Sequence, residues 1–271
     1  MRWPIVAALL LLSSCGEPLS EAETQSEFTP GPHQVDYHVS WDTEGVLFSE
    51  SGFELTNNLG YDIEVTTGYL VFYSTQLVPC EDEEGSELTS IDWGKWWGRL
   101  IGVRTAHAGH GEEDLDASVV AQSYVEDLTE PVSQQVGSRT IEGTLYCQIH
   151  YLVARGGTGT LQLPQEQDMV GSSLYLEGTW AVEGGEAQAF TISSSVAYGT
   201  LSNLYPSAFY GSADQELQVD ASQTGARIEI KRNLLGLFAD TDFKAMSDAQ
   251  LERRILQNVI EYTEFQVDLV P

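Results

Sequence analysis

Basic residues are scarce in this sequence. It has 12 Lys and Arg against 41 Asp and Glu, which gives a formal net charge of −29 over 271 residues. A surface of this sign repels a phosphate backbone, so we expect no nucleic-acid partner. It attracts cations, which is compatible with metal binding, but a highly solvated surface explains the charge equally well.

Known catalytic motifs are also missing. The chain contains no Gly-x-Ser-x-Gly and no His-Glu-x-x-His, and its glycine-rich residues 156–159 are not followed by the lysine of a phosphate-binding loop. So acidic a chain could contain a pair of catalytic carboxylates, but no motif or spacing singles out two of its acidic residues. We therefore expect that the protein is not an enzyme.

Long apolar runs are absent as well. The main one, residues 5–12, follows Arg2 and leads into Ser13-Ser14-Cys15. It is much shorter than the ~20 residues that a membrane-spanning helix needs. Its layout is that of a signal peptide, so we expect residues 1–14 to be removed on export.

Residues 12–15, Leu-Ser-Ser-Cys, resemble the lipobox of bacterial lipoproteins. The resemblance implies cleavage before Cys15 and acylation of its sulfur by fatty acids such as palmitate, which would anchor the protein to a membrane. Gly16 stands where an inner-membrane retention signal would have Asp, which favours the outer membrane, on its periplasmic face or at the cell surface. The alternative is an ordinary secretory signal, with Cys15 left as an unpaired thiol.

Only three cysteines are present. With Cys15 lipidated, Cys80 and Cys147 remain, and such a pair outside the cytoplasm most often forms a disulfide. The bridge would stabilise the domain by about 4 kcal/mol in the chain-entropy model. A thiolate site for a soft metal is the alternative.

The remaining chain is expected to form one domain over residues 33–271, after a polar tether over residues 15–32. Its length would also allow two domains. Alternation of polar and apolar residues with a period of two indicates half-buried strands. It occurs in residues 35–39, 61–65, 145–151, 173–177 and 227–230. These strands predict a mostly β protein, an antiparallel β-sandwich.

One helix is expected near the end of the chain. Ser247 and Gln250 have capping-box spacing, and Leu251, Ile255 and Val259 share one helical face. A final strand should follow over residues 265–270.

Residues 81–138 differ from the rest and predict a long irregular insertion. The stretch contains Trp93, Trp96 and Trp97, which would form either a platform for a glycan or protein partner or a lid packed on the sheet.

Two histidines in this insertion are candidate metal ligands. His107 and His110 lie three residues apart among small residues, with Glu112 close behind. Neutral imidazole is a common ligand of zinc and copper, and a third ligand would come from a strand, His150 before His38. The alternative is that His107 and His110 are exposed loop residues.

Calcium is a less favoured cofactor. Its candidate ligands are the acidic run 81–84 and the pair Asp240 and Asp242. Neither has EF-hand spacing, and contiguous acidic residues usually form a solvated loop.

Two segments are similar to the MbnP-like family of periplasmic copper-binding proteins: residues 68–77, and residues 234–242 with the helix that reaches Asn258. Ala106-His107 and Tyr146-Cys147 also resemble motifs of uncharacterised lipoproteins. The resemblance implies a β-sandwich and periplasmic or surface handling of copper. The chain has no clear match to the family's inward-facing histidines, so no ligand is carried over.

Two functions follow from the sequence. The first is an extracytoplasmic lipoprotein that binds copper or zinc, with delivery to an outer-membrane metal importer. The second is a non-catalytic surface, adhesion or structural lipoprotein. The sequence alone does not choose between them.

Overall fold

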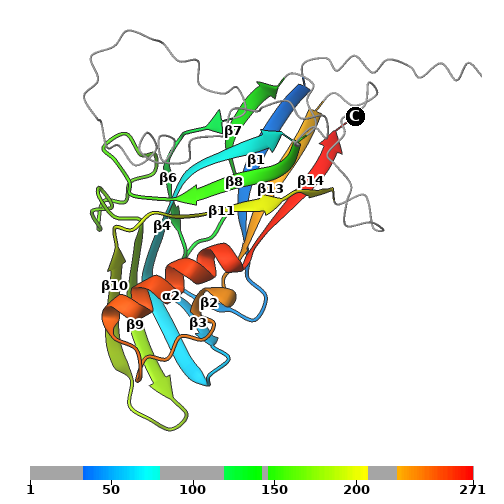
Figure 1. The fold of residues 1–271 in the computed structure, drawn as a ribbon. Helices are drawn as coiled ribbons and strands as arrows, with labels where there is room; N and C mark the ends of the chain where they lie inside the picture. The colour runs from blue at the N-terminus through cyan, green and yellow to red at the C-terminus, as the bar shows by residue number, and fades with distance from the viewer. Residues whose placement is uncertain (1–32, 80–118, 142–145, 207–224, 271) are drawn as a thin grey trace, which may run out of the picture.

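Two β-sheets dominate the fold in a computed structural model that describes residues 33–79, 119–141, 146–206 and 225–270 (Figure 1). The strands of sheet A are β1 (His33–Asp42), β7 (Gln134–Ile141), β12 (Tyr205–Pro206), β13 (Gly225–Asn233) and β14 (Thr263–Val270). Those of sheet B are β2 (Leu47–Ser49), β3 (Gly52–Thr56), β4 (Tyr61–Pro79), β5 (Val119–Val120), β6 (Tyr124–Asp127), β8 (Tyr146–Val153), β9 (Leu174–Val182), β10 (Gln188–Ser194) and β11 (Tyr198–Asn203). The inner faces of both sheets contribute to one hydrophobic core, which confirms the predicted mostly β sandwich.

Sheet A has the strand order β12-β14-β13-β1-β7. Strand β1, between β13 and the edge strand β7, pairs antiparallel with β7 but parallel with β13, in a register that places Gln34 beside Gly225 and Trp41 beside Arg232. The sequence predicted antiparallel pairing. Because β1 and β13 lie far apart in the chain, no hairpin imposes an antiparallel direction on them.

Sheet B is organised around β4, a strand of 19 residues. One edge of β4 pairs with β3, β6 and β5, and the other pairs with β9 and β8. Strands β5, β6 and most of β7 fall within residues 81–138, which were expected to be irregular. Tyr124 and Leu128 on this segment belong to the core, so its second part is integral to the sandwich.

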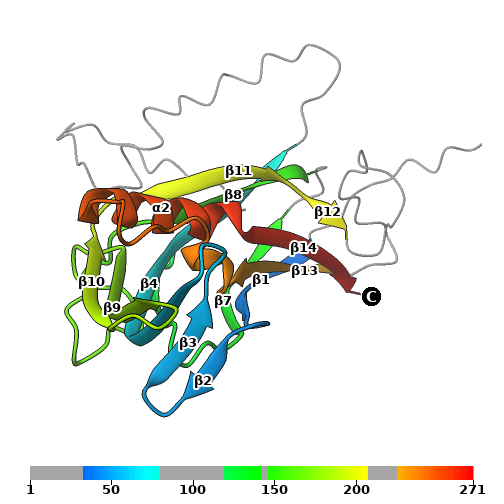
Figure 2. The same cartoon turned by 90° about the horizontal axis from the view of Figure 1, so that it is seen from below.

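The predicted helix is α2 (Asp248–Glu261), which begins after Ser247. The backbone N–H of Ser247 donates to Gln250 Oε1 over 2.9 Å, as the capping-box spacing predicted. The helix lies against β10 and β11 (Figure 2). Among the described residues, no helix is both long and apolar enough to cross a membrane.

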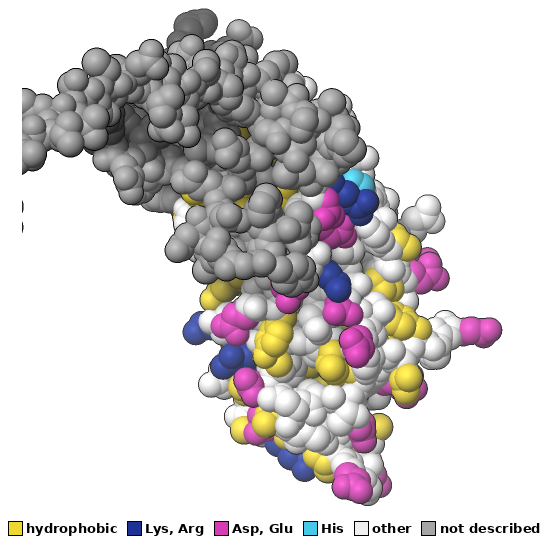
Figure 3. All heavy atoms as spheres, turned by 90° about the vertical axis from the view of Figure 1, so that its right-hand side faces the viewer, with side chains coloured by type: hydrophobic (Ala, Val, Ile, Leu, Met, Phe, Trp, Pro, Cys, Tyr) yellow, Lys and Arg dark blue, Asp and Glu magenta, His cyan; other side chains and the backbone are white. Residues whose placement is uncertain are grey.

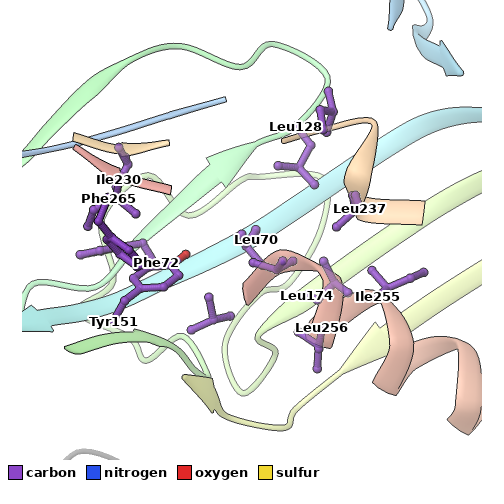
Figure 4. Packing of buried hydrophobic residues seen from close by; sticks show 14 of the residues in the cluster. Leu70, Phe72, Leu128, Tyr151, Leu174, Ile230, Leu237, Ile255, Leu256 and Phe265 are labelled. Atoms are coloured by element: carbon purple, nitrogen blue, oxygen red, sulfur yellow. The ribbon is translucent and has the colours of Figure 1, made fainter. Parts of the chain in front are cut away.

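The core residues labelled in Figure 4 are mainly aromatic at one end of the sandwich and aliphatic at the other. At one end Phe72 and Tyr151 of sheet B face Phe265 of sheet A, and the Tyr151 and Phe265 rings are 5.9 Å apart. At the other end α2 contributes Ile255 and Leu256, which pack with the short helix η1 (Gly236–Phe238) and sheet B. The helix therefore covers the part of sheet B that sheet A does not reach.

Candidate functional site

Several of the predicted site residues lie outside the described residues. They are Cys15, Cys80, His107 and His110, together with the three tryptophans and the acidic run 81–84. Lipidation, the disulfide and the loop histidines therefore stay predictions. The structure places His38, Cys147, His150, Asp240 and Asp242.

His150 lies in β8, on the face of sheet B that points away from the shared core. Its chain neighbours Ile149 and Tyr151 belong to the core, whereas the His150 side chain points to the opposite face. It is nevertheless only 3% exposed. Across the strands, His150 pairs with Gln76 of β4 on one side and Leu201 of β11 on the other.

The electrostatic state of His150 suits metal binding. Burial lowers the pKa of its imidazole to about 4, because a charged ring loses solvation in that position. The ring is therefore neutral at physiological pH. Neutral imidazole is the form that binds zinc or copper.

Cys147 lies in the same strand as His150, three residues earlier in the chain. The β4–β8 ladder shifts register at this point, since Val78 pairs with Gln148 and Pro79 with Tyr146. Cys147 is thus the extra residue of a β-bulge next to the end of β4. In the sequence, Cys80 comes directly after Pro79, the last residue of β4, and Pro79 pairs with Tyr146, the residue before Cys147.

His38 lies on the other side of the molecule. It alternates with the core residues Tyr37 and Val39 of β1, so its half-buried side chain faces outward from sheet A. Burial and the nearby Arg227 lower its pKa, opposed by Glu229 and Asp36. His38 and His150 therefore point away from each other from the two outer faces of the sandwich. Only one of them can serve as the third ligand of a site.

Asp240 and Asp242, the candidate calcium ligands, accept hydrogen bonds from neighbouring protein groups. Asp242 Oδ1 accepts a hydrogen bond from the Tyr61 hydroxyl over 2.6 Å and from two backbone N–H groups of the turn that follows. Asp240 Oδ1 accepts from Asn58 Nδ2 over 2.6 Å, while Asn58 Oδ1 accepts from the Asp240 N–H over 2.8 Å. These bonds join the β3–β4 turn to the loop before α2. Asp240 and Asp242 therefore have a structural role, and calcium is not part of the function proposed below.

A polar network that the sequence reasoning missed lies inside the sandwich. Arg232 of β13 and Glu126 of β6 form an ion pair through two hydrogen bonds, although both side chains are buried. The Trp41 indole N–H donates to Glu126 over 2.9 Å, and Arg232 donates to the Tyr151 hydroxyl over 3.2 Å. The Arg232 guanidinium also lies 4.5 Å from the centre of the Trp41 ring, a cation–π contact.

The pKa values of Tyr151 and Arg232 are both raised in this network, but for different reasons. Desolvation raises the pKa of Tyr151 to about 12, so its hydroxyl stays protonated and available to Arg232 as an acceptor. Burial lowers the pKa of Arg232, but the nearby Glu126 and Tyr151 outweigh this effect, so the pKa of Arg232 is raised. The network is therefore a fixed bridge between the sheets. With both of its charges enclosed by the core, it has a structural role.

A signal for half of this network was present in the sequence. Ala226, Ile228 and Ile230 alternate on the inward face of β13, and the same period places Arg232 inward. For Glu126 the signal was weaker, because its strand has four residues and is buried on both faces. Within the described ranges, no three His, Cys, Asp or Glu side chains are grouped closely enough to hold a metal ion.

No protein-family model matches this chain, and comparisons with curated proteins and with solved structures find no match either. The function is therefore argued from the chain's own residues.

Proposed function

We propose that the protein is an exported lipoprotein, anchored through Cys15, that binds copper or zinc with His107, His110 and His150. The observation that carries the proposal is a row of three residues across sheet B. Gln76 of β4 pairs with Val119 of β5 on one side and with His150 of β8 on the other.

This row shows that the segment with the loop histidines is long enough to reach His150. Val119 follows His110 by nine residues in the sequence, and nine residues extend to about 30 Å. Val119 is two strand spacings from His150, or about 10 Å. The other end of the segment leaves the sheet at Pro79, which also pairs with β8. One end of the segment that carries His107 and His110 therefore starts beside the strand that carries His150, and only β4 separates the other end from that strand.

His150 is the preferred third ligand for physical reasons. It is held by a paired strand, it faces outward, and its imidazole is neutral at pH 7. His38 belongs to the opposite face and drops out of the proposal. The net charge of −29 raises the local concentration of cations without identifying the site.

The test is titration of the full mature chain with cuprous and zinc ions. His107→Ala and His150→Gln should each weaken binding by at least about tenfold, because each removes one of few ligands. His38→Gln is the matched control, since it changes a strand histidine on the other sheet, and it should leave affinity unchanged. Affinity should also fall as pH drops through ~6.5, where exposed histidines become protonated.

Two outcomes would reject metal binding at this site. One is unchanged affinity in both His107→Ala and His150→Gln, and the other is an equal loss in His38→Gln. The non-catalytic surface or adhesion lipoprotein would then be the remaining function. Delivery to an outer-membrane importer is a further part of the proposal. If it is correct, the metal-loaded chain should transfer its ion to membranes that contain such an importer.

Membrane anchoring is tested separately. Cys15→Ala should release the protein from membranes into the soluble fraction, because the acyl chains are lost. Mass spectrometry of the native protein should show a diacylated N-terminal cysteine. An unmodified Cys15, or an uncleaved signal peptide, would contradict the anchor without bearing on metal binding.

A further inference from the structure

Strand β2 forms an exposed edge of sheet B. In the order β10-β9-β4-β3-β2 it is the last strand, and the hairpin of β2 and β3 projects from the body of the sandwich (Figure 2). Leu47 is 71% exposed and Phe48 is 43% exposed. Edge strands present unpaired backbone groups, and proteins usually protect them with charged side chains or cover them. Large apolar side chains on this edge therefore favour an interaction with another strand.

The two apolar side chains of β2 point to opposite faces of the sheet. Phe48 is on the core side, where its ring lies 5.9 Å from that of the buried Phe53. Leu47 is on the outer side and pairs across the strands with Glu54. A strand added beside β2 would thus have alternate side chains next to Phe48 and next to Leu47.

A groove of about 370 Å³ lies on the outer side, beside Leu47. Its acidic lining residues are Glu54, Asp62 and Glu64, and Glu54 stands directly opposite Glu64 in the β3–β4 register. Like charges in this position destabilise a sheet. Neither Lys nor Arg is among the residues that line the groove.

Another hollow of the described surface, lined in part by Asp42 and Lys231, differs in its charge. It measures about 150 Å³, and in it Lys231 Nζ lies 3.5 Å from Asp42 Oδ2, so part of its negative charge is balanced internally. On the surface that Figure 3 shows, Asp and Glu side chains are spread between exposed hydrophobic ones. The groove beside β2 combines acidic and exposed apolar side chains with a strand edge that no other described strand pairs with.

We propose that β2 is a docking site for an extended peptide segment of a partner protein, in which basic and apolar residues alternate. The segment adds to sheet B as a further strand. Its Lys or Arg side chains lie over the groove and neutralise Glu54 and Glu64, and its apolar side chains cover Phe48. Main-chain hydrogen bonds provide affinity and the alternation provides specificity, as in other cases of strand addition.

Charge selects this occupant over a second copy of the same chain. Pairing of two β2 edges would bring two sets of Glu54 and Glu64 together without any basic residue from either groove lining. Each copy also has a net charge of −29. A basic segment removes this repulsion, whereas a second copy increases it.

The experiment measures binding of a fluorescent, end-capped heptapeptide of alternating lysine and valine to the full mature chain. Glu54→Gln with Glu64→Gln should weaken binding about fivefold or more, because two partly exposed ion pairs of ~0.5–1 kcal/mol each are lost. The matched control is Glu186→Gln, an exposed glutamate in the β9–β10 turn, which should have no effect. Affinity should also fall with rising salt.

Two further peptides separate strand addition from general attraction to an acidic protein. The alternating peptide with N-methyl groups on every second residue keeps its charge but cannot complete the backbone ladder, so it should lose binding. A peptide of the same composition with all lysines preceding all valines should bind at least fivefold more weakly. Equal binding of these peptides, or equal loss in Glu186→Gln, would overturn the proposal, and so would dimerisation of the chain alone through β2.

Discussion

Arg232 and Glu126 come from different sheets and form an ion pair in the centre of the sandwich. The pair shares its environment with Trp41 and Tyr151, so each charge has more than one partner. A buried charge with such partners tolerates their loss poorly.

Glu126→Gln should therefore destabilise the domain by about 3–5 kcal/mol, because it leaves the Arg232 charge buried without a counter-ion. Urea unfolding of the full chain measures this. The control is Lys231→Met, at the residue next to Arg232. It breaks the partly exposed ion pair between Lys231 and Asp42 and should cost about 0–1 kcal/mol. Replacing both charges, with Glu126→Leu and Arg232→Met, should recover most of the loss. A Glu126→Gln variant as stable as Lys231→Met would contradict this account.

Burial of His150 predicts an acid-sensitive stability. Its pKa falls from 6.5 to about 4 on folding, so the unfolded chain binds more protons between these values. Stability from this residue is complete above about pH 6.5 and is lost as pH falls toward 4. The loss should reach about 3–3.5 kcal/mol, at ~1.4 kcal/mol for each pKa unit.

The measurement is unfolding free energy against pH for the wild type and for His150→Gln. The difference between the two curves isolates His150 from other groups that titrate in acid. It should change between pH 4 and 6.5 and stay constant above that range. Two parallel curves would show that His150 titrates alike in the folded and unfolded chain.

Asn57 provides a test of the contacts that hold the loop before α2. Its side chain is buried, and its amide donates to the carbonyls of Phe238 and Thr241 over 3.1 and 2.9 Å. Its oxygen accepts from the N–H groups of Leu59 and Tyr61, both over 3.0 Å. All four hydrogen-bonding positions of the amide are therefore used.

Asn57→Asp should cost about 2–4 kcal/mol at pH 7, because a carboxylate cannot donate to two carbonyls and is itself buried. The cost should decrease in acid, where the carboxyl group regains a proton. The control is Gln188→Glu, the equivalent change of an exposed amide at the start of β10, which should change stability by less than about 1 kcal/mol. Thermal or urea unfolding at pH 7 and pH 4 compares the two variants.

The disulfide between Cys80 and Cys147 remains a prediction. Non-reducing peptide mapping of the exported protein should recover the two cysteines in one linked pair. Cys147→Ser should lower stability by about 2–4 kcal/mol. A reducing agent should lower the wild type by a similar amount and leave Cys147→Ser unchanged. Recovery of both cysteines as free thiols under oxidising conditions would argue instead for the thiolate alternative.

Local patterns in the sequence predicted local structure well. The alternation at Arg227-Ile228-Glu229-Ile230 identified β13, and the Ser247–Gln250 spacing identified the start of α2. In each case neighbouring residues determine the structure, through the two-residue period of a strand or the hydrogen bonds of a helix end.

Features that depend on distant residues were harder to predict. The parallel pairing of β1 with β13 leaves no mark in either strand, because both would read alike in an antiparallel sheet. Glu126 lies in a short strand within an acidic stretch, and only its contact with Arg232 explains why a carboxylate is buried there. Similarly, the two glutamates beside β2 face each other only once β3 and β4 are in register.

The parallel pairing of β1 with β13 also affects the order in which the chain can fold. Gln34 and Gly225 are partners, although about 190 residues separate them, so the first strand to be synthesised gains its parallel partner only when most of the chain has been made. Contacts of such high sequence separation slow folding, since a long loop must be closed first. Sheet B can begin earlier from its hairpins, such as β2–β3 and β9–β10. Sheet A of this chain would therefore remain incomplete until late in synthesis, which is compatible with the proposed export of the chain.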